Sequence, residues 1–279
     1  MLVKAYIISD NSLKREPLRL KMIEIFNEQF FKYALISEQE EVKLNSNNLI
    51  NRLKLLYFSF SRLSFDLDHK NSGKIINNYF SKILYLIKLL LKFSFKKNEE
   101  INLKLRKIFI DNEVSKKHIK AWRDFIRNNA EYIFVCEDDI LCKQFSSTRL
   151  NKLLFHLKKN NIDLEYIDLA GGYPLEEVIP KNKIIENNKN FIKTKGIYTN
   201  TACGYLASKR IISNWINQIE KKRLKQNFPI DFLINFLGSK MQLKVFSMHF
   251  KETIFIHGSF NGKVDSWQNI FNTNTTYEN

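Results

Sequence analysis

Cysteine is scarce in this chain of 279 residues, and the cysteines that are present form no recognisable pattern. Cys136, Cys142 and Cys203 are odd in number and include no C-x-x-C pair. This argues against a disulfide framework and against a structural zinc site. The simplest setting is a reducing compartment, which predicts a cytoplasmic protein.

Long apolar runs are missing as well. No stretch of about 18 apolar residues occurs, so no membrane-spanning helix is expected. Residues 1–4 lead straight into a strand-like run, without the basic segment, apolar stretch and cleavage site that define a signal peptide. The length suits one large globular domain or two small ones with a sizeable core.

Acidic residues are few relative to basic ones. The chain has 45 Lys and Arg against 29 Asp and Glu, a formal net charge of +16. Such an excess favours polyanionic partners: nucleic acid, an anionic membrane or phosphorylated substrates. Residues 41–110 alone hold fourteen basic and five acidic residues, a net charge of +9. More than half of the excess therefore lies in a quarter of the chain.

The same basic segment contains two apolar stripes at helical spacing. The first comprises Leu49, Leu53, Leu56, Tyr57 and Phe60, and the second Phe80, Ile83, Leu84, Ile87, Leu90 and Leu91, with Lys88, Lys92 and Lys96 beside it. Lysines beside an apolar helical stripe are typical of a helix on an anionic membrane. The alternative is a pair of ordinary helices that pack on the core and expose their lysines to solvent.

Outside this segment the pattern is α/β. Residues 2–8 and 31–36 predict strands, and the helical spacing that follows Pro17 predicts a helix between them. From residue 111 the pattern predicts helices, strands and, over 181–195, a polar connection. In such a sheet, ligands bind outside the carboxyl ends of the strands, so the polar loop that begins at Ser9 is a natural nucleotide contact.

The strand predicted at Tyr132 ends in three carboxylates, Glu137, Asp138 and Asp139. Adjacent carboxylates repel one another, and their oxygens are the ligands that Mg²⁺ or Mn²⁺ prefers when it carries phosphates. The position and the chemistry both predict a site for a metal-bound nucleotide. The alternative is a solvated acidic turn after a strand.

Taken in order, the motifs resemble glycosyltransferase family 25, the lipopolysaccharide-type glycosyltransferases, many of them β-galactosyltransferases. The matching segments are Ile7-Ile8-Ser9, Ser12–Arg15 with Arg19, Lys117–Trp122, Glu137–Asp139, Thr199–Lys209, Pro229–Asp231, and His257–Ser259 with Asp265-Ser266. The likeness covers roughly residues 1–36 and 113–267 and leaves 41–110 outside. In one place the chain departs from the family pattern, because Lys117 stands where serine is usual before His118.

The resemblance implies a GT-A-like, Rossmann-type nucleotide-sugar-binding domain, a UDP-sugar donor and inversion at the anomeric carbon. The expected organisation is a glycosyltransferase domain of residues 1–40 and 111–270, a basic helical insertion over 41–110, and a flexible tail over 271–279. The implied cofactor is a divalent metal, Mn²⁺ or Mg²⁺.

Individual residues receive roles on the same basis. Asp139 is expected to bind the metal, with Glu137 as second ligand or ribose contact and Asp138 in a structural or interchangeable role. Contacts with the nucleotide are expected from Ser9, Arg15, Arg19, Tyr205 and Ser259, although solvated helix positions or core packing would also account for several of them. His118 is expected either to contact phosphate or to pack.

An inverting transfer needs a base to remove the proton of the acceptor hydroxyl. Asp231, which follows Pro229 at a predicted helix start, is the candidate. Its alternative role is an acid at the helix N-terminus, favoured by the helix dipole.

The sequence thus predicts an inverting glycosyltransferase that moves a hexose, galactose first among them, from a UDP-sugar to a lipooligosaccharide-type acceptor at the inner membrane. Two alternatives stay open: another metal-dependent nucleotide-binding transferase, such as a nucleotidyltransferase, and a basic nucleic-acid-binding protein. The last has no helix-turn-helix, RNA-recognition or zinc signature to support it, so no specific nucleic acid is expected as a partner. A family member that has lost its activity is a related possibility, because of Lys117.

Overall fold

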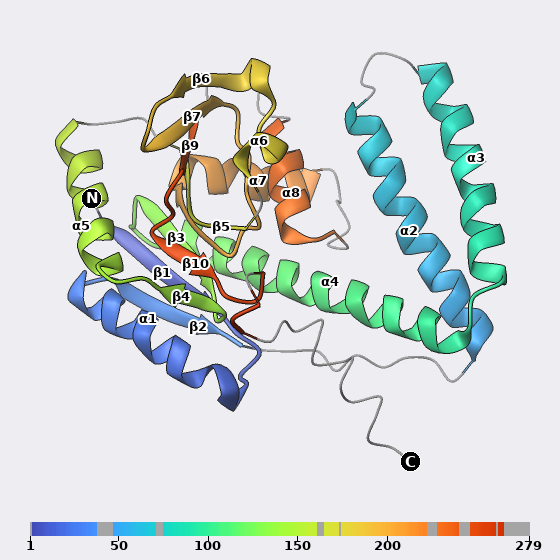
Figure 1. Ribbon diagram of the computed structural model, residues 1–279, viewed down its shortest axis with the longest axis horizontal. Coiled ribbons are helices and arrows are strands. Elements are labelled where there is room, and N and C mark those ends of the chain that lie inside the picture. Colours follow the sequence, from blue (N-terminus) through green and yellow to red (C-terminus); the bar gives the residue numbers. More distant parts are fainter. Residues whose placement is uncertain are drawn as a thin grey trace. The chain divides into compact units, whose positions relative to one another are not determined.

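The computed structural model describes residues 2–37, 47–70, 75–160, 165–172, 174–221, 228–239, 246–260 and 262–264. The chain divides into two compact units, one built from residues 1–39, 114–226 and 230–266 and the other mainly from residues 40–113 (Figure 1). The first unit carries the sheet, and the second is helical. The predicted tail over 271–279 and the Asp265-Ser266 motif lie outside the described residues.

The first half of the sheet is parallel. Strand β1 (Val3–Ile8) lies between β2 (Lys32–Ile36) and β3 (Tyr132–Glu137), and helix α1 (Glu16–Glu28) connects β1 to β2. This β2-β1-β3 order is that of a doubly wound nucleotide-binding fold. The register places Ile8 beside Glu137, so the ends of β1 and β3 lie at the same edge. The expectation of an α/β, Rossmann-type sheet is confirmed.

The second half of the sheet is mixed. Its order continues from β3 through β8 (Gly204–Ser208), β5 (Tyr166–Gly171), β9 (Phe246–Phe250), β7 (Phe191–Lys195) and β6 (Ile184–Asn187). Strand β8 is antiparallel to both of its neighbours, β3 and β5. Two short strands, β4 (Ile140–Cys142) and β10 (Phe255–His257), pair with each other, and β10 also joins β5. This arrangement brings the segment after Glu137 next to the segment that leads to Ser259.

The other helices of the first unit are α5 (Ser146–Asn160), α7 (Lys209–Lys221), α8 (Ile230–Ser239) and the short α6 (Leu175–Val178), with single 3-10 turns at Leu13–Arg15 and Lys181–Lys183. Apolar side chains fill the space between the helices and the sheet. The rings of Phe26 and Phe134 meet edge-on at 5.3 Å, and those of Trp122 and Trp215 lie 5.0 Å apart. All four side chains are fully buried, and their aromatic contacts stabilise the packing of the helices on the sheet.

The second unit is built from α2 (Asn48–Lys70), α3 (Ile75–Ser94) and the first half of the long helix α4 (Asn98–Ile126). Its core comprises Leu55, Leu89, Phe93, Ile101, Leu105 and Ile108. The predicted apolar stripe of α3 is not part of this core: Phe80, Ile83, Leu84, Ile87, Leu90 and Leu91 are all 46–65% exposed. In the described residues, no helix has the length and apolar content that spanning a membrane would require.

One local prediction was wrong. Residues 181–195 contain the antiparallel pair β6–β7 and not merely a polar connection. Within the Thr199–Lys209 segment, strand β8 begins at Gly204, because the preceding residues form a loop in which Thr201 and Ala202 have φ values of +90° and +54°. Positive φ is rare for a β-branched residue and marks strained backbone that neighbouring contacts must hold in place.

Candidate active site

The three carboxylates at the end of β3 lie at the edge of the sheet where β1 also ends. The Asp138 amide donates to the Ile8 carbonyl at 2.9 Å, and the Glu137 amide donates to the Cys203 carbonyl at 2.8 Å. These backbone bonds place the carboxylates between the loop after β1 and the strained loop before β8. Each of the three side chains then meets a different set of partners.

Asp138 forms a buried ion pair with Arg15. Its Oδ1 accepts from Arg15 Nη1 at 2.6 Å, and its Oδ2 accepts from the Asp10 amide at 3.0 Å. Arg19 lies 3.8 Å from the same carboxylate and donates to Ser9 Oγ at 3.2 Å. Because the Asp138 side chain is fully buried and the Arg15 side chain is only 4% exposed, the pair fixes the β1 loop from within.

Asp139 meets the loop after β10. Its Oδ2 lies 3.2 Å from His257 Nε2 and accepts a hydrogen bond from Ser259 Oγ. Burial by itself would raise the pKa of Asp139, but His257 and Ser259 outweigh it, so the pKa lies well below its usual value. Burial by itself would lower the pKa of His257, but the nearby Asp139 carboxylate outweighs this effect, so the pKa of His257 is raised. Asp139 is therefore ionised at neutral pH.

Glu137 faces a buried histidine. His118 Nδ1 lies 3.0 Å from the Tyr205 hydroxyl, which accepts from Trp122 Nε1 at 2.8 Å. The hydroxyl has one proton, and with Trp122 as its donor it is free to give that proton to Nδ1, which leaves the proton of neutral His118 on Nε2. Nε2 lies 3.4 Å from Glu137 Oε1 and makes no hydrogen bond within the described structure.

The protonation of this pair follows from burial. Burial lowers the pKa of His118 to about 3, so the ring stays neutral and presents an N–H to Glu137. Burial also raises the pKa of Glu137 to about 8, and the charge of Asp139 acts in the same direction. At neutral pH Glu137 is therefore largely protonated in the metal-free site, and a bound cation would favour its ionised form.

A second polar network holds the strained loop before β8. Asp168 Oδ2 accepts from the Asn200 amide at 2.6 Å, and its Oδ1 accepts from Thr199 Oγ1 at 3.2 Å. Thr201 Oγ1 then lies 3.1 Å from His257 Nδ1. Because His257 is held between Thr201 and Asp139, the strained loop orients the imidazole toward the carboxylate.

Asp231 lies in the first turn of α8, where its Oδ1 accepts from the Phe232 amide at 2.8 Å. Asn235, one turn further along the same face, accepts from the Thr199 amide at 2.9 Å. The face of α8 that carries Asp231 therefore packs on the loop that reaches His257. The role of Asp231 as the base stays a prediction.

The donor atoms fit a hard divalent cation only in part. Asp139, His257 and Cys203 bring ligand atoms within 4.8 Å of one another. Burial raises the pKa of Cys203 well above its usual value, so it remains a thiol whose Sγ lies 3.5 Å from Asp139 Oδ1. Mn²⁺ and Mg²⁺ prefer oxygen, which favours Asp139 and Glu137 as ligands, with His257 as a nitrogen ligand within reach.

The nucleotide contacts expected from the sequence differ in accessibility. Ser9, Arg15, Asp138 and Tyr205 are 0–3% exposed, and each has partners inside the protein. The Tyr205 ring is stacked against Tyr166 and His118 at 5.4 and 5.8 Å, so neither of its faces is open to a base. Glu137, Arg19 and Ser259 are partly exposed and are the members of the set that solvent reaches. Asp139 is itself 2% exposed, not the surface acid that a cleft position would suggest.

Lys117 is a site neighbour whose role the sequence did not indicate. Its ammonium donates to the Ser9 carbonyl at 2.5 Å, and the residue is 3% exposed. The substitution of lysine for the usual serine thus brings a cation to the loop after β1. Asp168 and Thr201 were also missed, because their contacts join residues far apart in the chain that no local pattern connects.

Replacement of Glu137 by Gln is expected to stabilise the metal-free protein in a pH-dependent way. In the unfolded chain Glu137 ionises near its ordinary pKa of 4.5, whereas in the fold its pKa is about 8. The wild type therefore loses stability relative to Glu137→Gln as the pH rises from about 4.5 to 8. At pH 8 the free energy of unfolding of Glu137→Gln should exceed that of the wild type by on the order of 1–3 kcal/mol, or several degrees in Tm. This difference should vanish near pH 4.5.

Thermal melts in EDTA between pH 4.5 and 8.5 test this expectation. Glu220→Gln, a matched change at an exposed glutamate of α7, should leave Tm nearly unchanged at every pH. A Tm difference between wild type and Glu137→Gln that stays constant across the range would contradict the raised pKa.

Comparisons with known proteins agree with the resemblance read from the motifs. Residues 114–234 match glycosyltransferase family 25, described as LPS biosynthesis protein. This segment runs from the second half of α4 through β3 and its three carboxylates to Asp231 in α8. The match supports a glycosyltransferase, and no curated protein matches the chain significantly.

Two solved structures are similar to the chain. One is a glycosyltransferase involved in the glycosylation of the major capsid of PBCV-1, at 6% identity over 100% of both chains, with a TM-score of 0.40. The other is apo-UDP-glucose pyrophosphorylase, at 14% identity over 98% of this chain and 100% of that chain, with a TM-score of 0.45. At these scores neither likeness bears on the activity of the chain.

Proposed function

We propose that this chain is a family 25 glycosyltransferase that transfers a hexose, in the first instance galactose, from a UDP-sugar to a lipooligosaccharide-type acceptor with inversion at the anomeric carbon. The observation that carries the proposal is the carboxylate cluster at the end of β3, held next to the ends of β1 and β10 by Arg15, His257 and Ser259. It occupies the edge at which open α/β sheets bind nucleotides. The family match supports the class of reaction.

Glu137 and Asp139 are the residues proposed to hold Mn²⁺ or Mg²⁺. The ion would offset charge on the diphosphate of the donor as the nucleotide leaves. The N–H of His118 Nε2 faces Glu137 from 3.4 Å, and Ser259 and His257 keep Asp139 oriented and ionised. Arg19 and Ser259, which solvent reaches, are proposed to contact the donor directly.

Asp231 is proposed as the base that takes the proton of the acceptor hydroxyl. Its position at the start of α8 supports this role, because Asn235 on the same face holds the loop that carries Thr201. The proton moves from the acceptor oxygen to the Asp231 carboxylate as that oxygen attacks the sugar carbon and the bond to UDP breaks. This would leave UDP on the β3 side of the site.

A donor screen tests the function. Purified protein is incubated with UDP-galactose, UDP-glucose and UDP-N-acetylhexosamines, with and without Mn²⁺, and UDP and pyrophosphate are measured separately. Release of UDP that depends on metal and is fastest with UDP-galactose is the expected result. Pyrophosphate release would instead indicate a nucleotidyltransferase. Stabilisation by duplex DNA but not by UDP with Mn²⁺ would favour nucleic-acid binding.

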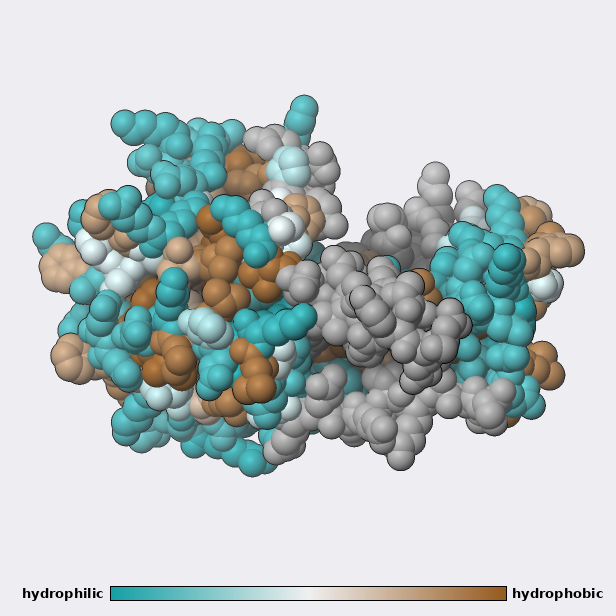
Figure 2. Space-filling view, turned by 60° about the horizontal axis from the view of Figure 1, so that its bottom comes forward, coloured by the Kyte–Doolittle hydropathy of each residue, from teal (hydrophilic) through white to brown (hydrophobic). Residues whose placement is uncertain are grey.

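The helical unit is proposed to hold the enzyme at an anionic membrane, as a peripheral protein. Along α3 the exposed apolar residues recur at i, i+3, i+4 and i+7 from Phe80, on the side opposite the buried Leu89 and Phe93. Lys88 and Lys92 are exposed at one border of this face. Figure 2 shows hydrophilic and hydrophobic residues side by side on the outer surface of this region.

The basic residues of this unit are close enough to influence one another. Burial lowers the pKa of Lys104 in α4, and the charges of Lys96, which follows α3, and of Lys92 within α3 act in the same direction. An exposed apolar face flanked by crowded lysines is what an interfacial helix presents to anionic lipid. Neither feature by itself requires a membrane, but together they match its two components, hydrocarbon and negative charge.

Substitution of Lys88 and Lys92 by Gln is expected to weaken binding to vesicles that contain anionic lipid by on the order of tenfold or more, since each lysine contributes about 1 kcal/mol there. Ile87→Ser with Leu91→Ser should weaken it further, and raised salt should screen the wild-type attraction. Co-sedimentation measures both effects, with Lys120→Gln in the sheet unit as the control. Equal sedimentation of wild type and variants with anionic and neutral vesicles would show that the face serves another purpose.

A further inference from the structure

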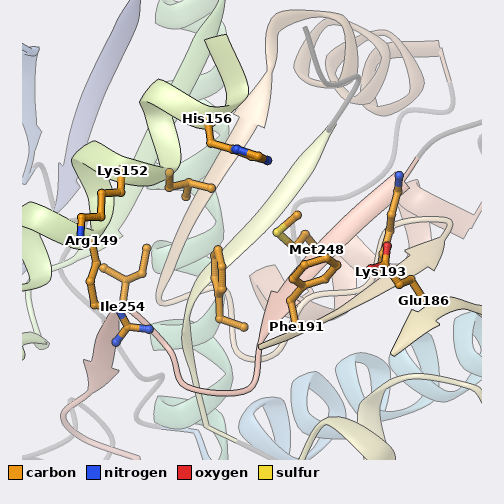
Figure 3. A pocket seen from close by; sticks show the side chains of 10 residues that line it. Arg149, Lys152, His156, Glu186, Phe191, Lys193, Met248 and Ile254 are labelled. Carbon is orange, nitrogen blue, oxygen red and sulfur yellow. The ribbon is translucent and has the colours of Figure 1, made fainter. Parts of the chain in front are cut away.

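A cavity of about 420 Å³ lies between α5 and the strand pair β7–β9, apart from the carboxylate site. Its lining comprises Arg149, Lys152, Leu153 and His156 from α5, Glu186 from β6, Phe191 and Lys193 from β7, Met248 and Phe250 from β9, and Ile254. Figure 3 shows side chains from the helix on one side and from the strands on the other. None of these residues belongs to the site at the end of β3.

The two walls follow from the periods of a helix and a strand. Positions 149, 152, 153 and 156 recur at i, i+3, i+4 and i+7, so they share one face of α5. Phe191 pairs with Phe250 and Lys193 with Met248, so these four share one face of the sheet. Their neighbour His249 points to the opposite face, where it lies 3.0 Å from Asp168. Strand β9 therefore separates the cavity from the network that holds the strained loop.

The lining combines an apolar floor with cationic groups. Phe191, Phe250, Met248, Leu153 and Ile254 supply the apolar surface. Of the three permanent cations, Arg149 is paired with Glu252 at 3.1 Å, and Lys193 lies 4.8 Å from the centre of the Phe246 ring. Lys152 makes no ion pair or hydrogen bond within the part of the chain that the structure describes. The acid in the lining, Glu186, accepts from Asn188 at 2.9 Å.

We propose that this cavity binds a small amphipathic anion, with a hydrocarbon or aromatic body on the floor of Phe191, Met248 and Phe250 and an acidic head group at Lys152. Its volume falls in the range of small-molecule sites, which are mostly apolar with a few polar groups that fix orientation. Because Arg149 is already paired with Glu252, the remaining charges of the lining are Lys152 and Lys193 against Glu186, which favours a negative head group over a neutral or positive one.

A pair of fluorescent probes that differ only in charge tests the proposal. Anilinonaphthalene sulfonate has an aromatic body with one sulfonate, and N-phenylnaphthylamine has the same rings without it. We expect saturable binding of one sulfonate probe per chain and binding of the neutral probe at least about tenfold weaker. Lys152→Gln should weaken binding of the sulfonate probe by on the order of tenfold, about 1.4 kcal/mol, and leave binding of the neutral probe unchanged, because it removes only the charge at the head group.

Further variants locate the bound probe. His156→Trp, at an exposed position of the lining, should narrow the cavity and weaken the binding of both probes. Lys158→Gln on the same helix lies outside the lining and should change the binding of neither. Displacement of the sulfonate probe by UDP with Mn²⁺ would place it in the donor site and overturn the proposal. Loss of binding in Ile87→Ser with Leu91→Ser would place it on α3 with the same consequence. Equal affinity for the two probes, or none for either, would also overturn it.

Discussion

Asp139→Asn should reduce sugar transfer by on the order of 10³-fold or more and remove the metal dependence of UDP binding. The change removes the charge proposed to hold the cation, whose stabilisation of the leaving diphosphate is worth several kcal/mol, about tenfold in rate for each 1.36 kcal/mol. The amide keeps an oxygen that can still accept from Ser259. Transfer is measured as UDP release with saturating donor, with and without Mn²⁺.

The choice of asparagine follows from the burial of Asp139. The residue is 2% exposed and is a partner of both His257 and Ser259. Asp139→Ala would remove the carboxylate partner of His257 and Ser259, so this variant should lose stability as well as activity. Asp111→Asn, an equally conservative change at a carboxylate that pairs with Arg62 at 3.0 Å in the helical unit, serves as the control. Near-wild-type turnover in Asp139→Asn, or no effect of EDTA on the wild type, would refute the metal assignment.

Asp231→Asn should lower kcat by about 10²–10⁴-fold while the affinity for UDP stays within a factor of about two. The amide cannot take the proton of the acceptor hydroxyl, but it can still accept from the Phe232 amide and so preserve the helix start. Donor affinity is measured by titration with UDP and Mn²⁺, and kcat by turnover with a saccharide acceptor.

The split between these two measurements identifies the role. Loss of UDP affinity together with kcat would make Asp231 a donor contact, and an unchanged kcat would leave it as a helix N-terminal acid favoured by the dipole. Asn235→Ala provides a comparison, because Asn235 holds the Thr199 amide but has no proton to transfer. It should perturb the loop and reduce kcat and donor affinity together.

The elements whose signals are local could be predicted from the sequence alone. The β-α-β opening and the strand that ends at Glu137 follow from apolar periodicity, and the observed strands Val3–Ile8, Lys32–Ile36 and Tyr132–Glu137 confirm them. The motif order predicted a likeness to glycosyltransferase family 25, and residues 114–234 match that family. The positive charge of residues 41–110 is likewise a property of composition, which no fold can change.

Local patterns failed where a side chain's role depends on distant partners. Three adjacent carboxylates look equivalent in sequence, yet one pairs with Arg15, one with His257 and one faces His118, across more than 100 residues in the first two cases and 19 in the third. Tyr205 resembles a stacking residue until the fold encloses its ring between Tyr166 and His118.

Which apolar stripes are buried depends on the folded arrangement of the helices and could not be predicted from the sequence pattern. Leu89 and Phe93 enter the core of the helical unit, whereas Ile87 and Leu91, from the same helix, remain exposed. Periodicity reports that a helix has an apolar face but not whether another element covers that face. Burial, and with it the pKa of Glu137 and the neutral state of His118, depends on contacts between segments that meet only when the chain folds.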